Sequence, residues 1–320
     1  MRVVSAAELD GLLSMRDVIA LMRDAFVAHG SGRTVLPDRT LLSAPGGRGS
    51  VLVMPASLTD RGEIGVKVVS VFPDNPTRSG APAISAQILA LDPETGAVAC
   101  VIDGTWVTAV RTAAVTALAT DLLARPDAER LVVYGAGVQA RTHVDAMCAV
   151  RPVRMVEVCG RSRTRTDRLV ETLRASHPDL DVRVASSPDA AAAWADLVVT
   201  ATTSTVPVFD GACLREGVHV NAVGSFLPHV RELDTPTVTR ARVYVDDRDH
   251  AWREAGDLRI PHEEGVFTEQ DIVGDLGALV CGRCAGRGDA RQITLFKSVG
   301  LAIEDVIVAA RVRELLTAAD

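Results

Sequence analysis

The stretch Leu131-Val-Val-Tyr-Gly-Ala-Gly-Val-Gln-Ala140 is a short apolar strand that runs directly into the pattern Gly135-x-Gly137-x-x-Ala140. A glycine turn between a buried parallel strand and a helix is typical of the doubly wound α/β domain that binds a dinucleotide pyrophosphate. The first glycine permits the tight turn, and the second lets backbone N–H groups approach phosphate at the start of the helix. The alternative is a strand, turn and helix that bind no ligand. Because the motif begins after more than a third of the chain, we expect another domain to precede it and to hold the substrate.

The chain after this turn alternates between strands and helices, which predicts a parallel, right-handed Rossmann-type sheet and an α/β fold. Strands are expected at 131–134, 154–158, 182–185, 196–201, 218–223 and 242–246. Helices are expected at 138–149, 164–176, 188–194, and around 248–255, 268–280 and 298–317.

The chain before the turn has a different pattern. Ser14 is expected to cap a helix over 15–30. Four closely spaced strands follow without intervening helices, which predicts an antiparallel or mixed sheet. Those strands are expected at 50–56, 64–72, 84–91 and 97–102. A strong helix from Thr108 to about Ala124 then ends before Pro126, which marks a domain junction.

Composition excludes several classes of protein. The 320 residues carry a net charge of −7 with acids and bases interspersed, so an electrostatic nucleic-acid binder is not expected. No apolar run has the length of a membrane helix, and the first residues lack the apolar segment of a signal peptide, so we expect a cytoplasmic protein. The six cysteines are scattered, as in a reduced protein. Cys281 and Cys284 lie in a Gly/Arg-rich loop without further ligands, and we predict no metal site.

The segment Val156-Glu157-Val158-Cys159-Gly160-Arg161-Ser162-Arg163 stands where an NAD-binding domain usually has an acid for the ribose hydroxyls. Glu157 lies inside the predicted strand instead of at its tip. Arg161, Ser162 and Arg163 suit a 2′-phosphate, because guanidinium groups and a hydroxyl donate hydrogen bonds to it. We therefore predict NADP(H) as the preferred cofactor, with NAD(H) as the alternative. An ordinary solvated basic loop would look the same.

Basic residues stand in apolar surroundings before the cofactor domain. Lys67 lies in the middle of a strand, Arg111 lies on the helix before the junction, and Arg39 follows Leu36-Pro-Asp. A buried cation is costly unless an anion is near, so these positions are candidates for a site. For Lys67, the alternative is the solvent face of a half-exposed strand.

At these residues the sequence resembles the ornithine cyclodeaminase/μ-crystallin family, and the resemblance covers nearly the whole chain. The segments that carry it are Leu36–Arg39, Gly65–Ser70, Leu91–Gly96, Val107–Val115, Gly135–Gln139, Val220–Gly224, Arg231–Asp234, Tyr244–Asp247, Glu254–Asp257, Phe296–Gly300 and Glu304-Asp305. The resemblance implies a nicotinamide-dependent enzyme that acts on a small amino or imino acid, usually as a homodimer. It also implies a substrate-binding and dimerisation domain over 1–115 with 300–320, and a dinucleotide-binding domain over 116–299.

The resemblance further implies roles for single residues. Arg39, Lys67 and Arg111 would bind the substrate carboxylate, with Lys67 and Arg111 as the catalytic pair and Lys67 as a donor of hydrogen bonds or a proton. Gly135, Gly137, Val138 and Gln139 would bind the pyrophosphate. Thr202 would lie near the adenosine, and Val223 and Ser298 near the nicotinamide.

One departure from the family pattern bears on the reaction. Ornithine cyclodeaminases and the related alanine dehydrogenases carry an Asp, the proposed acid/base, where this chain has Phe226 in Gly224-Ser-Phe-Leu-Pro228. A phenyl ring cannot accept a proton or pair with an ammonium. Ketimine-reductase-like members also lack that Asp, because their substrate arrives with its C=N bond already formed.

We therefore predict an NAD(P)H-dependent reductase of an imino acid, which transfers hydride to the imine carbon and could also run as an amino-acid dehydrogenase. Two alternatives stay open. One is an ornithine cyclodeaminase or alanine-dehydrogenase-like enzyme with a relocated acid/base. The other is a non-catalytic protein that binds NADPH and a small ligand.

Overall fold

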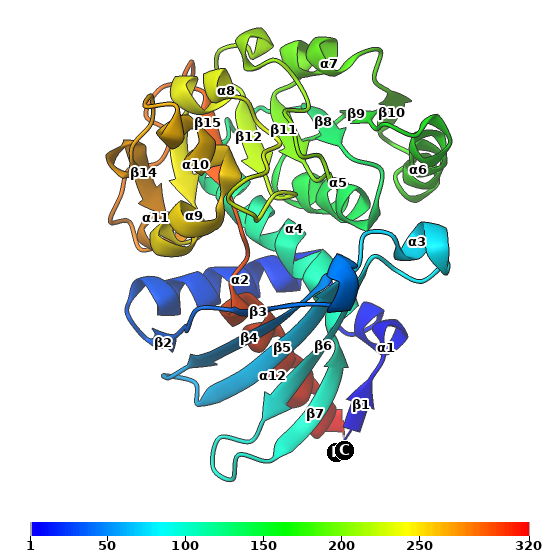
Figure 1. Cartoon of the computed structure of the whole chain (residues 1–320), viewed down its shortest axis with the longest axis vertical. Coiled ribbons are helices and arrows are strands. Elements are labelled where there is room, and N and C mark those ends of the chain that lie inside the picture. Colours follow the sequence, from blue (N-terminus) through cyan, green and yellow to red (C-terminus); the bar gives the residue numbers. More distant parts are fainter. Residues whose placement is uncertain (1, 320) are drawn as a thin grey trace. The chain divides into compact units, whose positions relative to one another are not determined.

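The chain folds into two compact units. The computed structural model describes residues 2–319. Unit 1 comprises Met1–Arg111 and Gly300–Asp320, and unit 2 comprises Thr112–Val299. The division falls within helix α4 (Gly104–Leu123), a few residues before the predicted boundary at 115 and 116. Figure 1 shows that the first strands and the last helix of the chain belong together in unit 1.

Unit 1 contains a seven-stranded mixed sheet of the kind that the strand spacing predicted. Its order is β1-β7-β6-β5-β4-β2, with β3 also paired to β4, and only the β1–β7 pair is parallel. The strands are β1 (Arg2–Val4), β2 (Thr34–Val35), β3 (Thr40–Ser43), β4 (Ser50–Leu58), β5 (Glu63–Val71), β6 (Ile84–Leu91) and β7 (Val98–Asp103). Short helices α1 (Ala6–Asp10) and α3 (Asn75–Arg78) lie in its connections.

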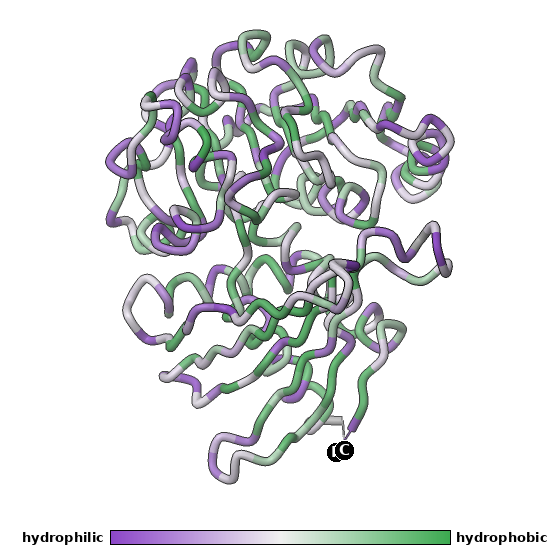
Figure 2. The backbone as a smooth tube through the Cα atoms, viewed as in Figure 1, coloured by the Kyte–Doolittle hydropathy of each residue, from purple (hydrophilic) through white to green (hydrophobic). Residues whose placement is uncertain are grey.

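Two long helices complete unit 1. α12 (Ala302–Ala319) packs on β4, β5 and β6, and α2 (Met15–Gly30) packs against α12. Ser14 caps α2 as expected: its hydroxyl accepts a hydrogen bond from the backbone N–H of Asp17. The hydrophobic segments in Figure 2 follow the strands and α12, while hydrophilic residues gather at the turns. The apolar contact between α12 and the sheet therefore provides much of this unit's core.

Unit 2 contains an eight-stranded sheet in which every pair of strands is parallel. The order is β10-β9-β8-β11-β12-β15-β13-β14. Strands β9 and β10 are added on one side of β8, and β11 and the later strands on its other side, so the strand order reverses between β8 and β11. The strands are β8 (Arg130–Tyr134), β9 (Met155–Cys159), β10 (Asp181–Val184), β11 (Leu197–Thr200), β12 (His219–Ala222), β13 (Arg242–Val245), β14 (Ile272–Asp275) and β15 (Thr294–Lys297). This is the predicted Rossmann-type sheet, and ligands of such sheets bind at the point of reversal.

Helices connect these strands. They are α5 (Val138–Val150), α6 (Arg163–Ser176), α7 (Pro188–Trp194), α8 (Thr235–Arg240), α9 (Arg248–Glu254), α10 (Gly256–Glu263) and α11 (Leu276–Val280). Ser or Asp side chains cap the N-termini of most of them, which satisfies backbone N–H groups that have no partner within the helix. None of the helices in residues 2–319 combines the length and apolar composition that crossing a bilayer requires.

One predicted helix was wrong: the segment 268–280 contains strand β14 before the short helix α11. The helix predicted at 298–317 corresponds to α12, which begins at Ala302, and strand β15 just before it was not predicted. Both missed strands have only four residues, Ile-Val-Gly-Asp and Thr-Leu-Phe-Lys, and neither sequence alternates between polar and apolar residues. Without that alternation, a short strand cannot be told from part of a buried helix by pattern alone.

Candidate active site

The chain has two lysines, Lys67 and Lys297, and both are buried. Lys67 lies on β5, on the face of the strand that also buries Glu63, Gly65 and Val69. Its Nζ lies 2.6 Å from Oδ2 of Asp305, and each side chain is only 1% exposed. The structure therefore excludes the alternative that Lys67 is on a solvent-facing side of its strand.

Arg111 is bound to the same acidic segment. Its Nη1 donates to Oε2 of Glu304 at 2.6 Å, and its Nε donates to Oδ1 of Asp305 at 3.3 Å. Asp305 thus bridges the two buried cations, Lys67 and Arg111. The acids belong to the first turn of α12, where the positive end of the helix dipole favours carboxylates.

The third predicted cation also contacts this part of the chain. Nη2 of the half-buried Arg39 donates to the backbone carbonyl oxygen of Gly300 at 2.8 Å. The structure therefore brings Arg39, Lys67 and Arg111 together on the segment from Gly300 to Asp305. Together with the two acids, these side chains carry three positive and two negative charges, which leaves a net charge of +1.

The surroundings of Lys67 change its proton affinity. Burial and the neighbouring Arg111 lower the pKa of Lys67 to about 8, and Asp305 opposes this shift. A lysine with a pKa near 8 exchanges its proton in the pH range where most enzymes work. Lys67 can therefore act both as a cation and as a proton donor.

The sequence analysis assigned no role to Glu304 and Asp305, although both occur in a segment that resembles the family. A signal was present in the sequence, because two buried cations require anions and two adjacent acids begin the last helix. What the sequence did not show was that this helix packs on β5.

The nucleotide turn of unit 2 has the geometry that its glycines predict. Gly135 has φ +122°, and a Cβ there would lie 2.5 Å from the carbonyl oxygen of Ala201. Gly137 precedes α5, which begins without a side-chain cap, and a Cβ on Gly137 would meet no protein atom within 4 Å. The fold itself thus requires glycine at position 135, whereas glycine at position 137 keeps space open at the helix N-terminus. That space fits the close approach of a pyrophosphate.

The loop after β9 carries the residues predicted to select the cofactor. Arg161, Ser162 and Arg163 are exposed. Nη2 of Arg161 donates to Oγ1 of Thr203 at 3.4 Å, whereas Arg163 donates from Nε to both carboxylate oxygens of Asp167 at 2.9 Å. Arg161 is therefore the less strongly bound of the two guanidinium groups.

The nearby hydroxyl and carboxylate have structural partners. Ser162 caps α6, and its Oγ accepts from the backbone N–H of Arg165. Glu157 is buried within β9 and forms an ion pair with Arg183 at 2.8 Å. This carboxylate is thus engaged within the sheet, as its position inside the predicted strand suggested.

The other predicted cofactor residues lie at the carboxyl ends of parallel strands. Thr202 follows β11, Val223 follows β12, and Ser298 follows β15. Thr202 donates through both its backbone N–H and its hydroxyl to Oε1 of Glu232 at 2.7 Å, and Ser298 donates to Oδ2 of Asp246 at 2.8 Å. Val138 and Gln139 form the first turn of α5. Carboxyl ends of parallel strands share one edge of the sheet, so these residues gather on the edge where dinucleotides bind.

Sequence reasoning also missed a buried acid on this edge. Glu232 is fully buried, and burial together with the neighbouring Asp257 raises its pKa. Lys297, the second lysine, has two partners: Oδ2 of Asp257 at 2.8 Å and the carbonyl oxygen of Ser225 at 2.6 Å. Glu232, Asp257 and Lys297 are thus connected buried charged residues, and hydrophobic periodicity alone does not reveal such a cluster.

Phe226 is half-buried and packs against the apolar core of unit 2. His229, which follows it, is exposed. His143 and His219 are buried, and burial lowers the pKa of His143 to about 4 and that of His219 to about 3. Both histidines are therefore neutral near pH 7, and they hydrogen-bond to neighbouring threonines, which suits a structural role.

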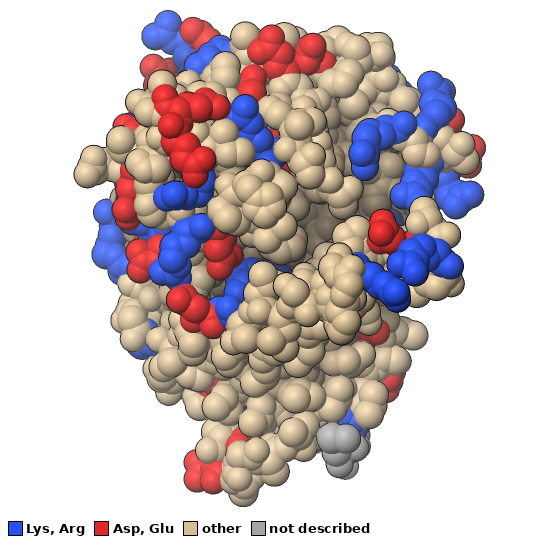
Figure 3. Space-filling model, in the orientation of Figure 1, with Lys and Arg blue, Asp and Glu red and all other residues tan. Residues whose placement is uncertain are grey.

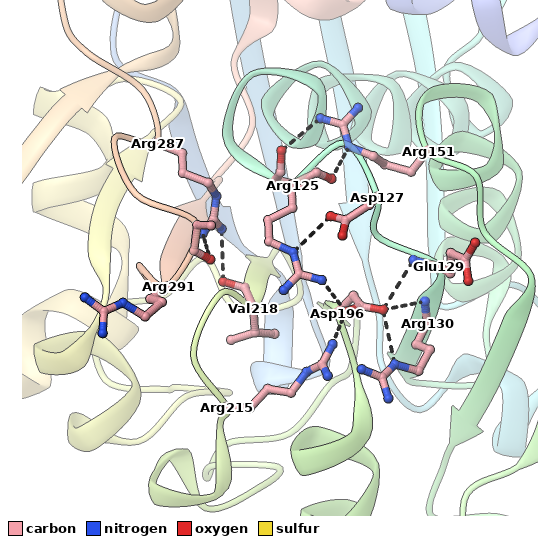
Figure 4. Close-up of polar contacts among 12 residues, drawn as sticks. Arg125, Asp127, Glu129, Arg130, Arg151, Asp196, Arg215, Val218, Arg287 and Arg291 are labelled. Atoms are coloured by element: carbon pink, nitrogen blue, oxygen red, sulfur yellow. Dashed lines mark hydrogen bonds and ion pairs between the residues drawn. The ribbon is translucent and has the colours of Figure 1, made fainter.

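At the amino ends of the strands of unit 2, arginine side chains surround a buried aspartate, as Figure 4 shows. Asp196, at the start of β11, forms ion pairs with Arg125, Arg130 and Arg215 and accepts from the backbone N–H of Arg130 at 3.0 Å. Arg287 donates to carbonyl oxygens and to the hydroxyl of Thr294. These contacts join the loops at the amino ends of the strands, away from the edge that carries the glycine turn.

Comparison with known proteins agrees with this geometry. All 320 residues match the sequence model of the ornithine cyclodeaminase/mu-crystallin family. This chain belongs to that family. The family and the Rossmann-type fold predicted from the sequence are thus confirmed.

Two relatives are similar to this chain in sequence over nearly their whole length. It is 36% identical over 310 residues to a delta(1)-pyrroline-2-carboxylate reductase of Bacillus cereus, an alignment that covers 97% of this chain and 94% of the relative. It is 33% identical over 310 residues to the ketimine reductase mu-crystallin of Mus musculus, with coverage of 96% and 94%.

Two solved structures are also similar. The delta(1)-pyrroline-2-carboxylate reductase of Thermococcus litoralis, in complex with NADH and L-proline, has a TM-score of 0.95 and 38% identity, and the match covers 98% of this chain and 97% of that one. An archaeal alanine dehydrogenase dimer with bound NAD has a TM-score of 0.93 and 29% identity, with coverage of 100% and 97%.

Proposed function

We propose that this chain reduces the C=N bond of a cyclic ketimine carboxylate, with delta(1)-pyrroline-2-carboxylate as the first substrate to test. The chain is an oxidoreductase of the imine-reductase class and uses a nicotinamide cofactor, in agreement with its relatives. The proposed product is the corresponding cyclic amino acid, which for this substrate is proline. The same chemistry in reverse is an amino-acid dehydrogenase reaction.

The observation that carries the proposal is the set of partners around Lys67. An ammonium group has three N–H donors. Among residues 2–319, Asp305 is the one partner of Lys67, whereas the equally buried Lys297 has two. A buried ammonium with donors to spare, beside a buried arginine, suits an anionic ligand such as a carboxylate.

We assign the substrate carboxylate to Arg39, Lys67 and Arg111. A bound nicotinamide supplies the hydride, which adds to the imine carbon. Lys67 gives a proton to the imine nitrogen and is reprotonated from solvent, so hydride and proton together convert the imine to an amine. Because the pKa of Lys67 is lowered to about 8, it releases this proton more readily than an ordinary lysine.

Phe226 favours reduction over cyclodeamination. An acid/base at this position would have to accept a proton or hold an ammonium, and the phenyl ring does neither. Its packing against the apolar core of unit 2 gives it a structural role instead. An imine substrate needs only a carboxylate site, a hydride and one proton donor, so the reductase reaction does not require an acid at position 226.

The glycine turn fits a dinucleotide, because Gly137 leaves open the space in which a pyrophosphate would accept N–H hydrogen bonds from the start of α5. Arg161 supports a preference for NADPH, since among residues 2–319 its exposed guanidinium forms one long hydrogen bond, to Thr203, and no ion pair with a carboxylate. We therefore propose NADPH as the better cofactor and NADH as a weaker one. The roles of Val138, Gln139, Thr202, Val223 and Ser298 in holding it are part of the same proposal.

We also propose that the enzyme is a homodimer whose subunits associate through the sheet of unit 1. Ile64 and Val68 on β5 and Leu42 on β3 are exposed on the same face of the sheet, and such apolar sheet faces are typical of subunit interfaces. Few charges interrupt the surface over these strands in Figure 3. The similarity to a dimeric alanine dehydrogenase supports this assembly. A cytoplasmic location stays a prediction.

The function is tested by following NADPH oxidation with delta(1)-pyrroline-2-carboxylate and by identifying proline as the product. In parallel, L-ornithine is supplied with NAD⁺, and ammonia and proline are measured. Reduction of the ketimine without ammonia release from ornithine supports the proposal. Proline formed from ornithine would show that another residue supplies the acid/base function that Phe226 lacks. NADPH binding with no turnover of any ketimine would favour a non-catalytic binding protein.

A further inference from the structure

The carboxylate of Glu232 accepts four hydrogen bonds, although it lies between β12 and α8, outside the nucleotide turn and the strands that lead to it. Oε1 accepts from the backbone N–H and the hydroxyl of Thr202, both at 2.7 Å. Oε2 accepts from the hydroxyl of Thr200 at 2.9 Å and from the backbone N–H of Gly224 at 2.7 Å. The side chain is fully buried, so these four donors are its hydrogen-bond environment.

The donors come from the ends of two adjacent strands. Thr200 is the last residue of β11 and Thr202 follows that strand, while Gly224 follows the end of β12. The two ends touch: a Cβ on Gly224 would lie 2.4 Å from the carbonyl oxygen of Thr202 and 2.5 Å from Oε1 of Glu232. Only glycine at position 224 permits this approach. The carboxylate of Glu232 therefore joins the two strand ends, in addition to the hydrogen bond that the backbone N–H of Val223 donates to the carbonyl oxygen of Thr200 at 3.0 Å.

These strand ends adjoin the nucleotide turn. The sheet reverses between β8 and β11, and a Cβ on Gly135, at the end of β8, would lie 2.5 Å from the carbonyl oxygen of Ala201. A displacement of the β11 end would thus move a wall of the glycine turn. The position of that wall matters, because binding of a pyrophosphate depends on the placement of backbone N–H groups.

A second buried pair holds Glu232 in place. Oδ1 of Asp257 accepts from the backbone N–H groups of Glu232 at 2.7 Å and Leu233 at 2.9 Å. Oδ2 of Asp257 lies 2.8 Å from Nζ of Lys297, and the same ammonium donates to the carbonyl oxygen of Ser225. The β12 end is therefore held at Gly224 by Glu232 and at Ser225 by Lys297.

We propose that Glu232 is a positioning residue of the dinucleotide site, which fixes the ends of β11 and β12 so that the adjoining glycine turn can bind the cofactor. The proposal rests on the proposed nicotinamide-dependent function. Glu232 itself contacts neither substrate nor cofactor in this scheme. It acts through Thr202, Gly224 and Ala201, which lie between it and the turn.

The substitution Glu232→Gln tests the proposal. A glutamine keeps the size of the side chain, but its NH₂ group must face N–H or O–H donors at one of the two strand ends. We expect the dissociation constant of NADPH, measured by fluorescence, to rise about tenfold or more, in the range for small misplacements of binding groups. The KM for NADPH should rise with it, while the KM for the imino acid, which the residues of unit 1 are proposed to bind, should stay close to the wild-type value.

Glu157→Gln is the matched control. It applies the same change to another buried, hydrogen-bonded carboxylate of unit 2, one that pairs with Arg183 on the edge strand β10. It should leave the dissociation constant of NADPH unchanged. If both variants weaken NADPH binding equally in proportion to their loss of thermal stability, Glu232 has only a structural role and the proposal is overturned.

Thr200→Val keeps the proposal testable if Glu232→Gln does not fold. Valine has nearly the shape of threonine and removes one donor to Oε2 at a buried position. We expect a weaker loss of NADPH affinity in the same direction, with the fold retained. Unchanged NADPH affinity in a folded Thr200→Val variant would refute the positioning role. Because NADPH binding is measured directly, this result does not depend on whether the ketimine is the correct substrate.

Discussion

Nζ of Lys67 and Oδ2 of Asp305 lie 2.6 Å apart, and neither side chain is accessible to solvent beyond 1%. The same carboxylate contacts Arg111, so one acid from the last helix compensates part of the charge of two cations. Breaking such a buried pair is costly, because it leaves an isolated charge in a poorly solvated place. The Lys67–Asp305 contact therefore stabilises unit 1 and raises the pKa of Lys67 against the lowering caused by burial and Arg111.

Lys67→Met should abolish ketimine reduction. The variant lacks both the cation that binds the carboxylate and the proton donor, and loss of a general acid alone typically costs about 10²–10⁴-fold in rate. NADPH binding, measured by fluorescence, should not change. Lys67→Arg is the matched variant: it keeps the charge but holds its proton too tightly to donate it. We expect it to retain a near-normal KM with a much reduced kcat, and equal kcat values for Lys67→Arg and the wild type would remove proton donation from the scheme.

The pH dependence of the reaction should report Lys67. Because burial and Arg111 lower its pKa to about 8, the protonated form that binds the carboxylate and donates the proton is lost above that pH. The value of kcat/KM should therefore be constant below pH 8 and fall about tenfold for each pH unit well above it. With two lysines in the sequence, ¹⁵N-lysine NMR can follow the titration directly, and Lys67→Met identifies the signal. A Lys67 signal that titrates above pH 10 would contradict the assignment.

Asp305→Asn should lower both stability and the pKa of Lys67. Removing the carboxylate leaves Lys67 and Arg111 with Glu304 alone, and breaking a buried pair costs about 3–5 kcal/mol. Because Asp305 raises the pKa of Lys67, its loss should move the alkaline limb of kcat/KM to lower pH. Urea denaturation and the pH profile measure the two effects. Asp24→Asn, at the exposed pair with Arg61, is the control and should change stability by less than about 1 kcal/mol.

Arg161→Ala should reduce the preference for NADPH. Hydrogen bonds to a charged group contribute about 1.5–3 kcal/mol, so the KM for NADPH should rise about tenfold or more while that for NADH changes little. Steady-state kinetics with both cofactors measure the ratio. Arg291→Ala, at the amino edge of the same sheet, should leave both values unchanged. An equal rise in both KM values for Arg161→Ala would mean that this guanidinium does not recognise the 2′-phosphate.

Val68→Glu should dissociate the proposed dimer. A carboxylate on the exposed apolar face of β5 would be buried without a partner in the interface, which is strongly unfavourable. Sedimentation velocity should show the wild type as a dimer and the variant as a monomer that keeps its circular dichroism. Val206→Glu, at an exposed valine of unit 2, is the control and should remain dimeric. A wild-type protein that sediments as a monomer would refute the assembly.

Much of the fold could be predicted because its signals are local. The turn at Gly135 combines a buried strand, a glycine with positive φ and the start of a helix, and the ten residues from Leu131 to Ala140 are enough to predict all three. The helix over 15–30 was predicted from one capping serine and one apolar face. The strands β14 and β15 were missed because their four residues do not alternate between polar and apolar side chains, which is the pattern that identifies a strand.

For the candidate site, the sequence by itself determined the chemistry that was present: a dinucleotide turn, three cations in apolar surroundings, and no acid at position 226. Only the tertiary structure decided what those groups can do. The packing of α12 on β5 brings Asp305 from near the end of the chain to Lys67, and the parallel sheet brings the ends of β11 and β12 to one carboxylate at Glu232. Proton affinity and backbone placement depend on desolvation and on charges that are distant in sequence, so neither can be read from a local pattern.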